Sequence, residues 1–247
     1  MQSPTSEHET YVELVMNEHP AAIRRTQAWG YERMRRLFAQ LAGVPVRSRG
    51  YVEVDRFDDP AALILSGSFA PWSHHDQAAL RRLERGLSGY GGPVLGICAG
   101  MQLQVMFAGG AIAPRRDPVV GFRRIEAPAQ VDLLQDMNPT ATVYAHHSED
   151  VVGLPANAHV LARSERCPVE ALRLTDRRWW GTQFHPEVFT ARRPDGRQVL
   201  ENFFALAGLA RGPSDSERGF SLDSVRQPGL ESLPVCYAPS REERATG

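Results

Sequence analysis

Two short, unbroken apolar runs, each followed by a turn and a helix-like stretch, constrain the fold of this chain more than any other feature. The runs are Ala62–Leu65 and Val94–Ile97. Four consecutive apolar residues bounded by turn residues are typical of a strand buried on both faces. Helices are expected over Asp76–Leu87, between the runs, and over Gly100–Phe107, after the second. This alternation predicts an α/β fold with a mostly parallel central sheet flanked by helices.

The rest of the chain extends this pattern and then changes character. We also expect strands over Tyr11–Met16, Val44–Val54 and Trp179–Phe184, helices over Ala21–Leu41 and Arg197–Ala207, and short strands with many turns between Arg115 and Arg178. After Gly208 the composition shifts toward Pro, Ser and Arg. Residues 1–210 are therefore predicted to form one domain, and residues 211–247 a C-terminal tail that is flexible or lies over the surface.

Composition excludes several classes of function. All 28 basic residues are Arg, so a Walker phosphate loop, a pyridoxal-phosphate Schiff base and a kinase-type phosphate lysine are all excluded. A net charge of −1 argues against general nucleic-acid binding. No apolar run reaches the roughly 18 residues of a membrane span, and the polar start lacks a signal peptide's apolar region.

The cysteines indicate a reducing compartment. Cys98, Cys167 and Cys236 are widely spaced and odd in number, and no Cys-x-x-Cys pair is present. This usage fits neither a disulfide framework nor a zinc site. His74 and His75 are expected in a loop, with no four zinc ligands nearby. We expect a cytoplasmic protein without metal or cofactor.

The segment Gly96–Gly100 fits the pattern Gly-x-nucleophile-x-Gly, with Cys98 at the nucleophile position. This pattern requires a strand before it and a helix after it, and both are predicted here. The helix dipole favours the thiolate form of such a cysteine. The backbone N–H of Ala99 would point at the same spot and could stabilise an oxyanion. A small buried cysteine in a glycine-rich turn would give the same local pattern.

A second element, His185-Pro186-Glu187, follows an apolar strand further along the chain. A catalytic thiol needs a base to exchange its proton and a carboxylate to orient that base. Side chains two residues apart on an extended chain point the same way, so His185 and Glu187 can pair. A surface histidine with a nearby glutamate is the alternative. Together with the cysteine turn, the Cys…His…Glu set is far more specific than either half.

These two segments resemble a known family. Val94–Gln102 and Trp180–Val188 resemble the two signature blocks of class I glutamine amidotransferase domains. The stretch from Val151 to Leu172 is most similar to the glutaminase part of GMP synthase. The resemblance covers roughly residues 52–208. It implies a flavodoxin-like sheet and a glutaminase triad with Cys98 as nucleophile, His185 as base and acid, and Glu187 as the group that orients the histidine.

The resemblance also implies residues that hold glutamine. Gln102 lies where the family has a pocket-lining Gln, and His147-Ser148 falls near the segment that holds the α-amino and α-carboxylate groups. For His146-His147, a strand end with one inward and one outward ring is an equal alternative. The family usually has Gly-Gly-Pro at the second oxyanion loop, whereas this chain has Ser66-Gly67-Ser68-Phe69-Ala70-Pro71. The N–H of Gly67 or Ser68 would then have to serve as the second donor.

The resemblance implies release of ammonia from L-glutamine through a thioester, for transfer to an acceptor on a separate synthetase subunit. No Ser-Gly-Gly triplet of an ATP-pyrophosphatase loop occurs here. Three alternatives stay open: a stand-alone γ-glutamyl hydrolase or amidase with the same triad, a non-catalytic homologue with an altered oxyanion loop, and a thiol hydrolase of unrelated substrate.

Overall fold

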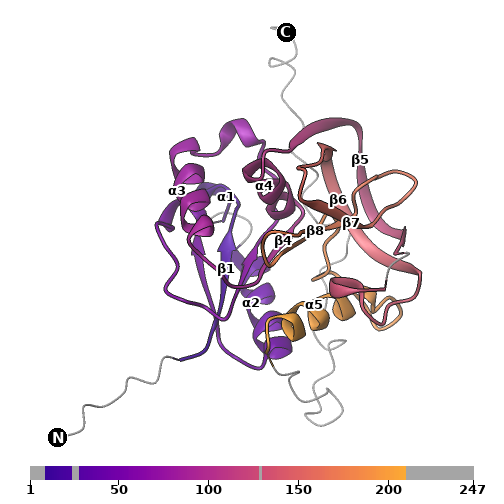
Figure 1. Ribbon diagram of the computed structural model, residues 1–247, viewed down its shortest axis with the longest axis horizontal. Helices are drawn as coiled ribbons and strands as arrows, with labels where there is room; N and C mark the ends of the chain where they lie inside the picture. Colours follow the sequence, from indigo (N-terminus) through magenta and orange to yellow (C-terminus); the bar gives the residue numbers. More distant parts are fainter. Residues whose placement is uncertain (1–8, 24–27, 128–129, 210–247) are drawn as a thin grey trace, which may run out of the picture.

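The computed structural model describes residues 9–23, 28–127 and 130–209, and its centre is a seven-stranded sheet (Figure 1). Its strands occur in the order β2 (Val46–Gly50), β1 (Val12–Met16), β3 (Ala62–Leu65), β4 (Val94–Ile97), β9 (Trp179–Thr182), β8 (Ala171–Leu174) and β7 (Ala158–Ala162). The pairs from β2 through β9 are parallel, and β8 and β7 extend the sheet antiparallel. The predicted α/β class is confirmed.

Helices cover both faces of the sheet. They are α1 (Pro20–Ala22), α2 (Ala28–Ala42), α3 (Gln77–Ser88), α4 (Ala99–Phe107) and α5 (Asp195–Leu206), with 3-10 turns at Tyr51–Glu53, Trp72–His74 and Asp132–Leu134. Helices α2 and α5 pack in one apolar cluster and α3 and α4 in another, on opposite faces. Figure 1 shows α2 and α5 adjacent, and the rings of Phe38 and Phe204 meet edge to face at 6.3 Å.

The central strands are apolar throughout because both faces are covered. Every residue of β3 and β4 is buried, as expected for strands between two helical layers. Helix α3 begins where Asp76 accepts hydrogen bonds from the N–H groups of Ala78 and Ala79, a standard N-cap. Its buried leucines then lie three and four residues apart and face the sheet. Local sequence and tertiary burial therefore agree in this half of the molecule.

The region after α4 differs from the prediction of short strands with many turns. It contains two long antiparallel strands, β5 (Ala111–Glu126) and β6 (Thr140–Gly153), which form a separate ribbon. The backbone of residues 115–118 has no register partner in β6, so the strand pairing is interrupted between Pro114 and Val119. Figure 1 shows the ribbon to one side of the central sheet.

Other boundaries shift by a few residues. The predicted first helix corresponds to α1 and α2, with residues 24–27 outside the described ranges. The expected second strand ends at Gly50 and continues as a 3-10 turn, and β9 ends at Thr182. The predicted tail, 211–247, and Cys236 lie outside the described residues, so the domain boundary at 210 stays a prediction. Within the described ranges, no helix is long and apolar enough to cross a membrane.

Candidate active site

Cys98 lies on a sharp turn between β4 and α4, in the geometry that the Gly-x-nucleophile-x-Gly pattern predicts. Its backbone has φ +52° and ψ −107°, a conformation that costs energy for a residue with a side chain. Its N–H donates to the carbonyl of Thr182 at 2.7 Å, which ties the turn to β9. The cysteine residue is 5% exposed.

The two glycines of the pattern are required by close approach. A Cβ on Gly100 would lie 2.2 Å from the carbonyl oxygen of Leu65, and one on Gly96 would lie 2.6 Å from the backbone N of Met101. Real Cβ atoms do not come so near to main-chain atoms. Glycine at these positions lets α4 start directly against β3 and β4.

His185 and Glu187 follow β9 and pair with each other. The Nδ1 atom of His185 lies 2.8 Å from Oε1 of Glu187, so the two side chains pair as predicted. They do so across a turn and not on extended chain, because the N–H of Val188 donates to the carbonyl of His185 at 3.1 Å. The backbone N–H of His185 donates to the carbonyl of Tyr144 in β6 at 2.7 Å. A Cβ on Gly67 would lie 3.0 Å from Cε1 of His185 and 3.6 Å from Cβ of Cys98. The structure thus brings together the histidine, the cysteine and the loop after β3.

The electrostatics of His185 favour its charged form. Burial disfavours an imidazolium, but the Glu187 carboxylate and, in the same direction, Cys98 outweigh burial and raise the pKa of His185 well above its ordinary value. A carboxylate at hydrogen-bond distance stabilises the charged ring and fixes which nitrogen faces it. The ring is therefore set up to hold a proton next to Cys98.

Replacing Glu187 with Gln is expected to lower the pKa of His185 toward the ordinary value of about 6.5, because a neutral amide no longer stabilises the imidazolium. NMR titration of the His185 ring measures this shift. The pKa of His185 is raised in the folded chain, so the pair stabilises the fold fully below about pH 6.5 and loses this contribution as pH rises through the folded-state pKa. The unfolding free energy of Glu187→Gln should therefore depend less on pH above 6.5. Glu149→Gln serves as the control. An unchanged titration of His185 in Glu187→Gln would contradict the assignment of Glu187 as the group that raises the pKa of His185.

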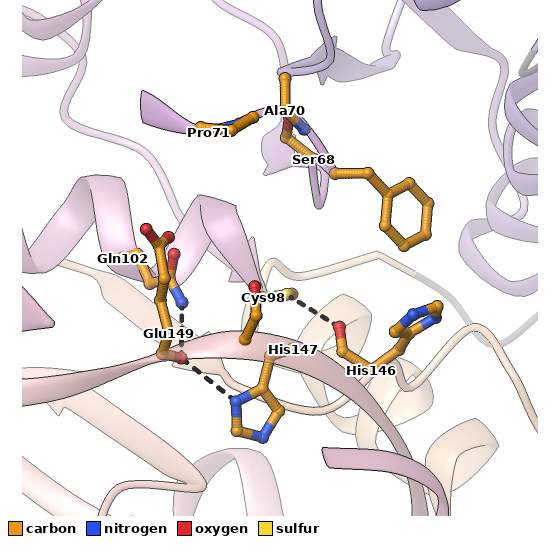
Figure 2. A pocket seen from close by; sticks show the side chains of 10 residues that line it. Ser68, Ala70, Pro71, Cys98, Gln102, His146, His147 and Glu149 are labelled. Atoms are coloured by element: carbon orange, nitrogen blue, oxygen red, sulfur yellow. Dashed lines mark hydrogen bonds between the residues drawn. The ribbon is translucent and has the colours of Figure 1, made fainter. Parts of the chain in front are cut away.

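A cavity of about 100 Å³ opens beside Cys98, well above the roughly 10–15 Å³ that one water molecule needs. Figure 2 shows it between the loop after β3 and strand β6. Ten residues line it: Ser68, Phe69, Ala70, Pro71, Cys98, Gln102, His146, His147, Ser148 and Glu149. Three of the predicted substrate-binding residues, Gln102, His147 and Ser148, are thus in one cavity with Cys98.

Gln102 is held by a network across the cavity wall. Its Nε2 donates to the carbonyl of Glu149 at 3.1 Å and to Oε1 of Gln183 at 3.3 Å, and its Oε1 accepts from the indole N–H of Trp72 at 3.3 Å. Gln183 in turn donates to Sγ of Cys98 at 3.6 Å. The position of Gln102 is therefore fixed relative to the cysteine.

The rings of His146 and His147 lie on opposite sides of β6, yet both are buried. His146 packs edge to face against Phe69 at 4.9 Å, and burial, with smaller effects of His185 and His147, lowers the pKa of His146 to about 4. The alternative of one inward and one outward ring is wrong as to exposure, because the ring of His147, on the other side of the strand, is buried as well. Its Nδ1 lies 3.1 Å from the carbonyl of Glu149 and 3.3 Å from Oδ1 of Asp150.

His147, Asp150 and Cys167 place potential metal-ligating atoms within 4.8 Å of one another. Arg115 forms an ion pair with Asp150 and so already supplies a positive charge there. We interpret the cluster as a partly buried ion-pair network next to the cavity. Of the two residues expected in a loop, His74 ends a 3-10 turn, and His75 is buried and lies 2.9 Å from the carbonyl of Asn17.

The loop after β3 is braced by residues that the sequence patterns did not reveal. The Ser66 hydroxyl accepts from the N–H of Asn17 at 2.9 Å, and the Asn17 amide donates to the carbonyl of Ser66 at 2.7 Å. The Tyr31 hydroxyl lies 3.1 Å from that of Ser66. Asn17 directly follows the end of β1, and β1 pairs with β3. Polar residues at neighbouring strand ends are the signal that could have identified them.

The chain is similar in sequence to glutamine-hydrolysing proteins. The sequence model of the family "Glutamine amidotransferase class-I" matches residues 26–207. The GMP synthase of Thermus thermophilus is 40% identical over 155 residues, which are 62% of this chain and 29% of that protein. A protein of Methanococcus aeolicus, named as one of the subunits of a GMP synthase, is 35% identical over 117 residues, 47% of this chain and 61% of that protein. The chain thus spans less than a third of the first of these relatives.

Solved structures agree in fold. A structure from Thermoplasma acidophilum, also named for one of the GMP synthase subunits, superposes with a TM-score of 0.70 at 23% identity, covering 86% of this chain and 97% of that one. A glutamine amidotransferase from Thermotoga maritima gives a TM-score of 0.55 at 16% identity, covering 81% and 94%. Both carry the same α/β architecture. Because the family model matches most of the chain, this protein belongs to the class I glutamine amidotransferases.

Proposed function

We propose that this chain is a glutaminase that releases ammonia from L-glutamine through a thioester on Cys98 and delivers it to an acceptor on a separate synthetase subunit. The observation that carries the proposal is the placement of Gly67 against both Cys98 and the Glu187-paired ring of His185. The proposed nucleophile, the proposed base and the backbone of the loop after β3 are thus adjacent, next to the cavity that Cys98 lines. This is the arrangement that acyl transfer from an amide requires.

The first half-reaction forms the thioester. His185 takes the proton of the Cys98 thiol, and the sulfur attacks the side-chain carbonyl carbon of glutamine, forming a C–S bond. The oxyanion accepts hydrogen bonds from the N–H of Ala99 and that of Gly67 or Ser68, and one such donor typically contributes about 3 kcal/mol. As the C–N bond breaks, His185 returns the proton to the leaving nitrogen and ammonia departs.

The second half-reaction restores the enzyme. His185 takes a proton from water, whose oxygen attacks the thioester carbonyl. The C–S bond breaks, the proton passes to sulfur, and glutamate leaves. Throughout, Glu187 orients the imidazole and stabilises its charged form. Gln102 forms a wall of the cavity, and the exposed Ser148 with the main chain of His147 is suited to hold the α-amino and α-carboxylate groups of the substrate.

A separate acceptor protein is proposed because two relatives, from Methanococcus aeolicus and Pyrococcus abyssi, are named as individual subunits of GMP synthase. The chain should be purified with whatever synthetase-like protein accompanies it and assayed for ammonia release from L-glutamine, by itself and in the complex. We expect L-glutamine to be hydrolysed in preference to other γ-glutamyl amides, and faster in the complex. Hydrolysis of diverse γ-glutamyl amides at a rate independent of any partner would instead select a stand-alone amidase.

Glutamine recognition can be tested apart from turnover. The diazoketone analogue of glutamine, 6-diazo-5-oxo-L-norleucine, should alkylate Cys98, and intact mass with peptide mapping locates the adduct. L-Glutamine should protect Cys98 against the reagent. If Cys98 does not react, the chain is a non-catalytic homologue and the proposed function is wrong.

A further inference from the structure

A buried carboxylate from a distant part of the chain holds the loop after β3. Glu18 follows β1 and is 1% exposed. Its Oε2 accepts a hydrogen bond from the N–H of Phe69 at 2.7 Å, and its Oε1 accepts from the Ser68 hydroxyl at 3.1 Å and from the N–H of His19 at 2.8 Å. Burying a carboxylate is costly unless it accepts hydrogen bonds, and these three hydrogen bonds offset that cost.

These contacts determine the direction of the peptide groups around Ser68. The carboxylate holds the N–H that follows Ser68 in the chain, and it also holds the Ser68 side chain. The same hydroxyl accepts from the N–H of Ala70 at 3.1 Å, so one acidic group organises Ser68, Phe69 and Ala70. In the described part of the chain, the N–H groups of Gly67 and Ser68 have no hydrogen-bond partner. Glu18 thus occupies the neighbouring donors and leaves these two for a ligand.

The loop position matters because it adjoins the reacting groups. Gly67 lies against both His185 and Cys98, so a small rotation of the 67–69 backbone changes where its N–H groups point relative to the sulfur. Oxyanion donors act only when they are held in advance at about 2.7–3.1 Å from the developing charge. The serine at position 68 lacks the conformational freedom of glycine, and external hydrogen bonds can hold it in one conformation.

We propose that Glu18 is a positioning residue that holds the Ser68–Phe69 peptide so that the N–H groups of Gly67 and Ser68 face the substrate oxyanion. This inference rests on the proposed glutaminase function. Glu18 does not touch the substrate. Its effect is therefore on the chemical step rather than on glutamine binding.

The test measures alkylation of Cys98 by 6-diazo-5-oxo-L-norleucine as a function of reagent concentration, which separates the limiting rate, kinact, from the binding constant, KI. In Glu18→Ala, kinact should fall about 10- to 100-fold, with KI changed less than about twofold. In Glu18→Gln, kinact should fall less than in Glu18→Ala, because the amide keeps one carbonyl oxygen as an acceptor. Ser68→Ala removes the hydroxyl's hydrogen bonds to Glu18 and to the N–H of Ala70 but keeps the backbone N–H of residue 68 and the bond from Phe69 N–H to Glu18. It should reduce kinact by about 3- to 10-fold.

Glu13→Gln is the matched control. Glu13 is also a buried glutamate, 4% exposed, on the strand that precedes Glu18, and it pairs with Arg49 rather than with the loop. Glu13→Gln should leave kinact and KI unchanged, even if it lowers the melting temperature.

The outcomes separate the two proposals. The positioning role is overturned if kinact is unchanged in Glu18→Ala, or if KI rises by the same factor by which kinact falls. Alkylation of the wild type upholds the proposed function in either case. If Glu18→Ala does not fold, Ser68→Ala decides, and an unchanged kinact there overturns the role. If wild-type Cys98 is not alkylated, the proposed function fails and the positioning role fails with it.

Discussion

Replacing Cys98 with Ala should abolish ammonia release from glutamine, lowering the rate by at least about a thousandfold. The variant keeps the proposed oxyanion donors and the His185–Glu187 pair but has no atom that can form the proposed thioester. Activity is measured as ammonia released per enzyme, with the synthetase partner present if the complex is the active form. Glutamine should still bind, because the wall of the cavity around Gln102 is unchanged.

Cys167→Ala is the matched control for this experiment. Cys167 is the other buried free cysteine of the described chain, and it does not line the cavity. Its thiol donates to the carbonyl of Val169, so its loss should lower stability slightly and leave turnover intact. If Cys98→Ala retained activity and Cys167→Ala lost it, the nucleophile assignment would be wrong.

Replacing Gly100 with Ala should have the largest effect on stability, a loss of about 3 kcal/mol or more. The added Cβ would lie 2.2 Å from the Leu65 carbonyl oxygen and 2.8 Å from its carbonyl carbon. Main-chain atoms of a central strand cannot rotate away as a side chain does. Helix α4 and strand β3 would have to separate, displacing the N–H of Ala99 as well. Urea denaturation followed by circular dichroism measures the loss.

Gly91→Ala provides the comparison. No atom lies within 4 Å of a Cβ built at Gly91, and its φ is not positive. This substitution should change the unfolding free energy by less than about 0.5 kcal/mol. Equal denaturation midpoints for Gly100→Ala and Gly91→Ala would show that the close approach of α4 and β3 does not determine the free energy of unfolding.

Elements whose structure depends on residues close in sequence could be predicted from the sequence. Buried strands appear as unbroken apolar runs, and the turn at Cys98 needs glycines at fixed offsets, so β3, β4 and the cysteine turn could be located. His185 and Glu187 are two residues apart, so their proximity could be predicted, although they pair across a turn after β9 and not along an extended strand. Gln102 was placed at the cavity only by the family resemblance, and the structure has it among the residues that line the cavity with Cys98.

Contacts between distant segments could not be predicted in this way. Glu18 meets Phe69 across 51 residues of sequence, and no periodic pattern encodes such a hydrogen bond. The sequence of this region predicts short strands, whereas the structure has one long strand, β5, which contains prolines and arginine pairs and whose side chains show no regular alternation of burial. A two-stranded ribbon outside the main sheet lacks a continuous buried face, so the apolar period of two that marks ordinary strands is weak.

The ribbon also has a mechanical consequence. It joins the catalytic region through the bond from His185 N–H to the Tyr144 carbonyl and through the carbonyl of His146, which accepts from Cys98 Sγ at 3.7 Å. The same strand supplies one wall of the cavity, while its other end continues to Gly153. Because Tyr144 and His146 belong to the strand that also supplies a wall of the cavity, a change in the bend of β6 there would move that wall together with its contacts to Cys98 and His185.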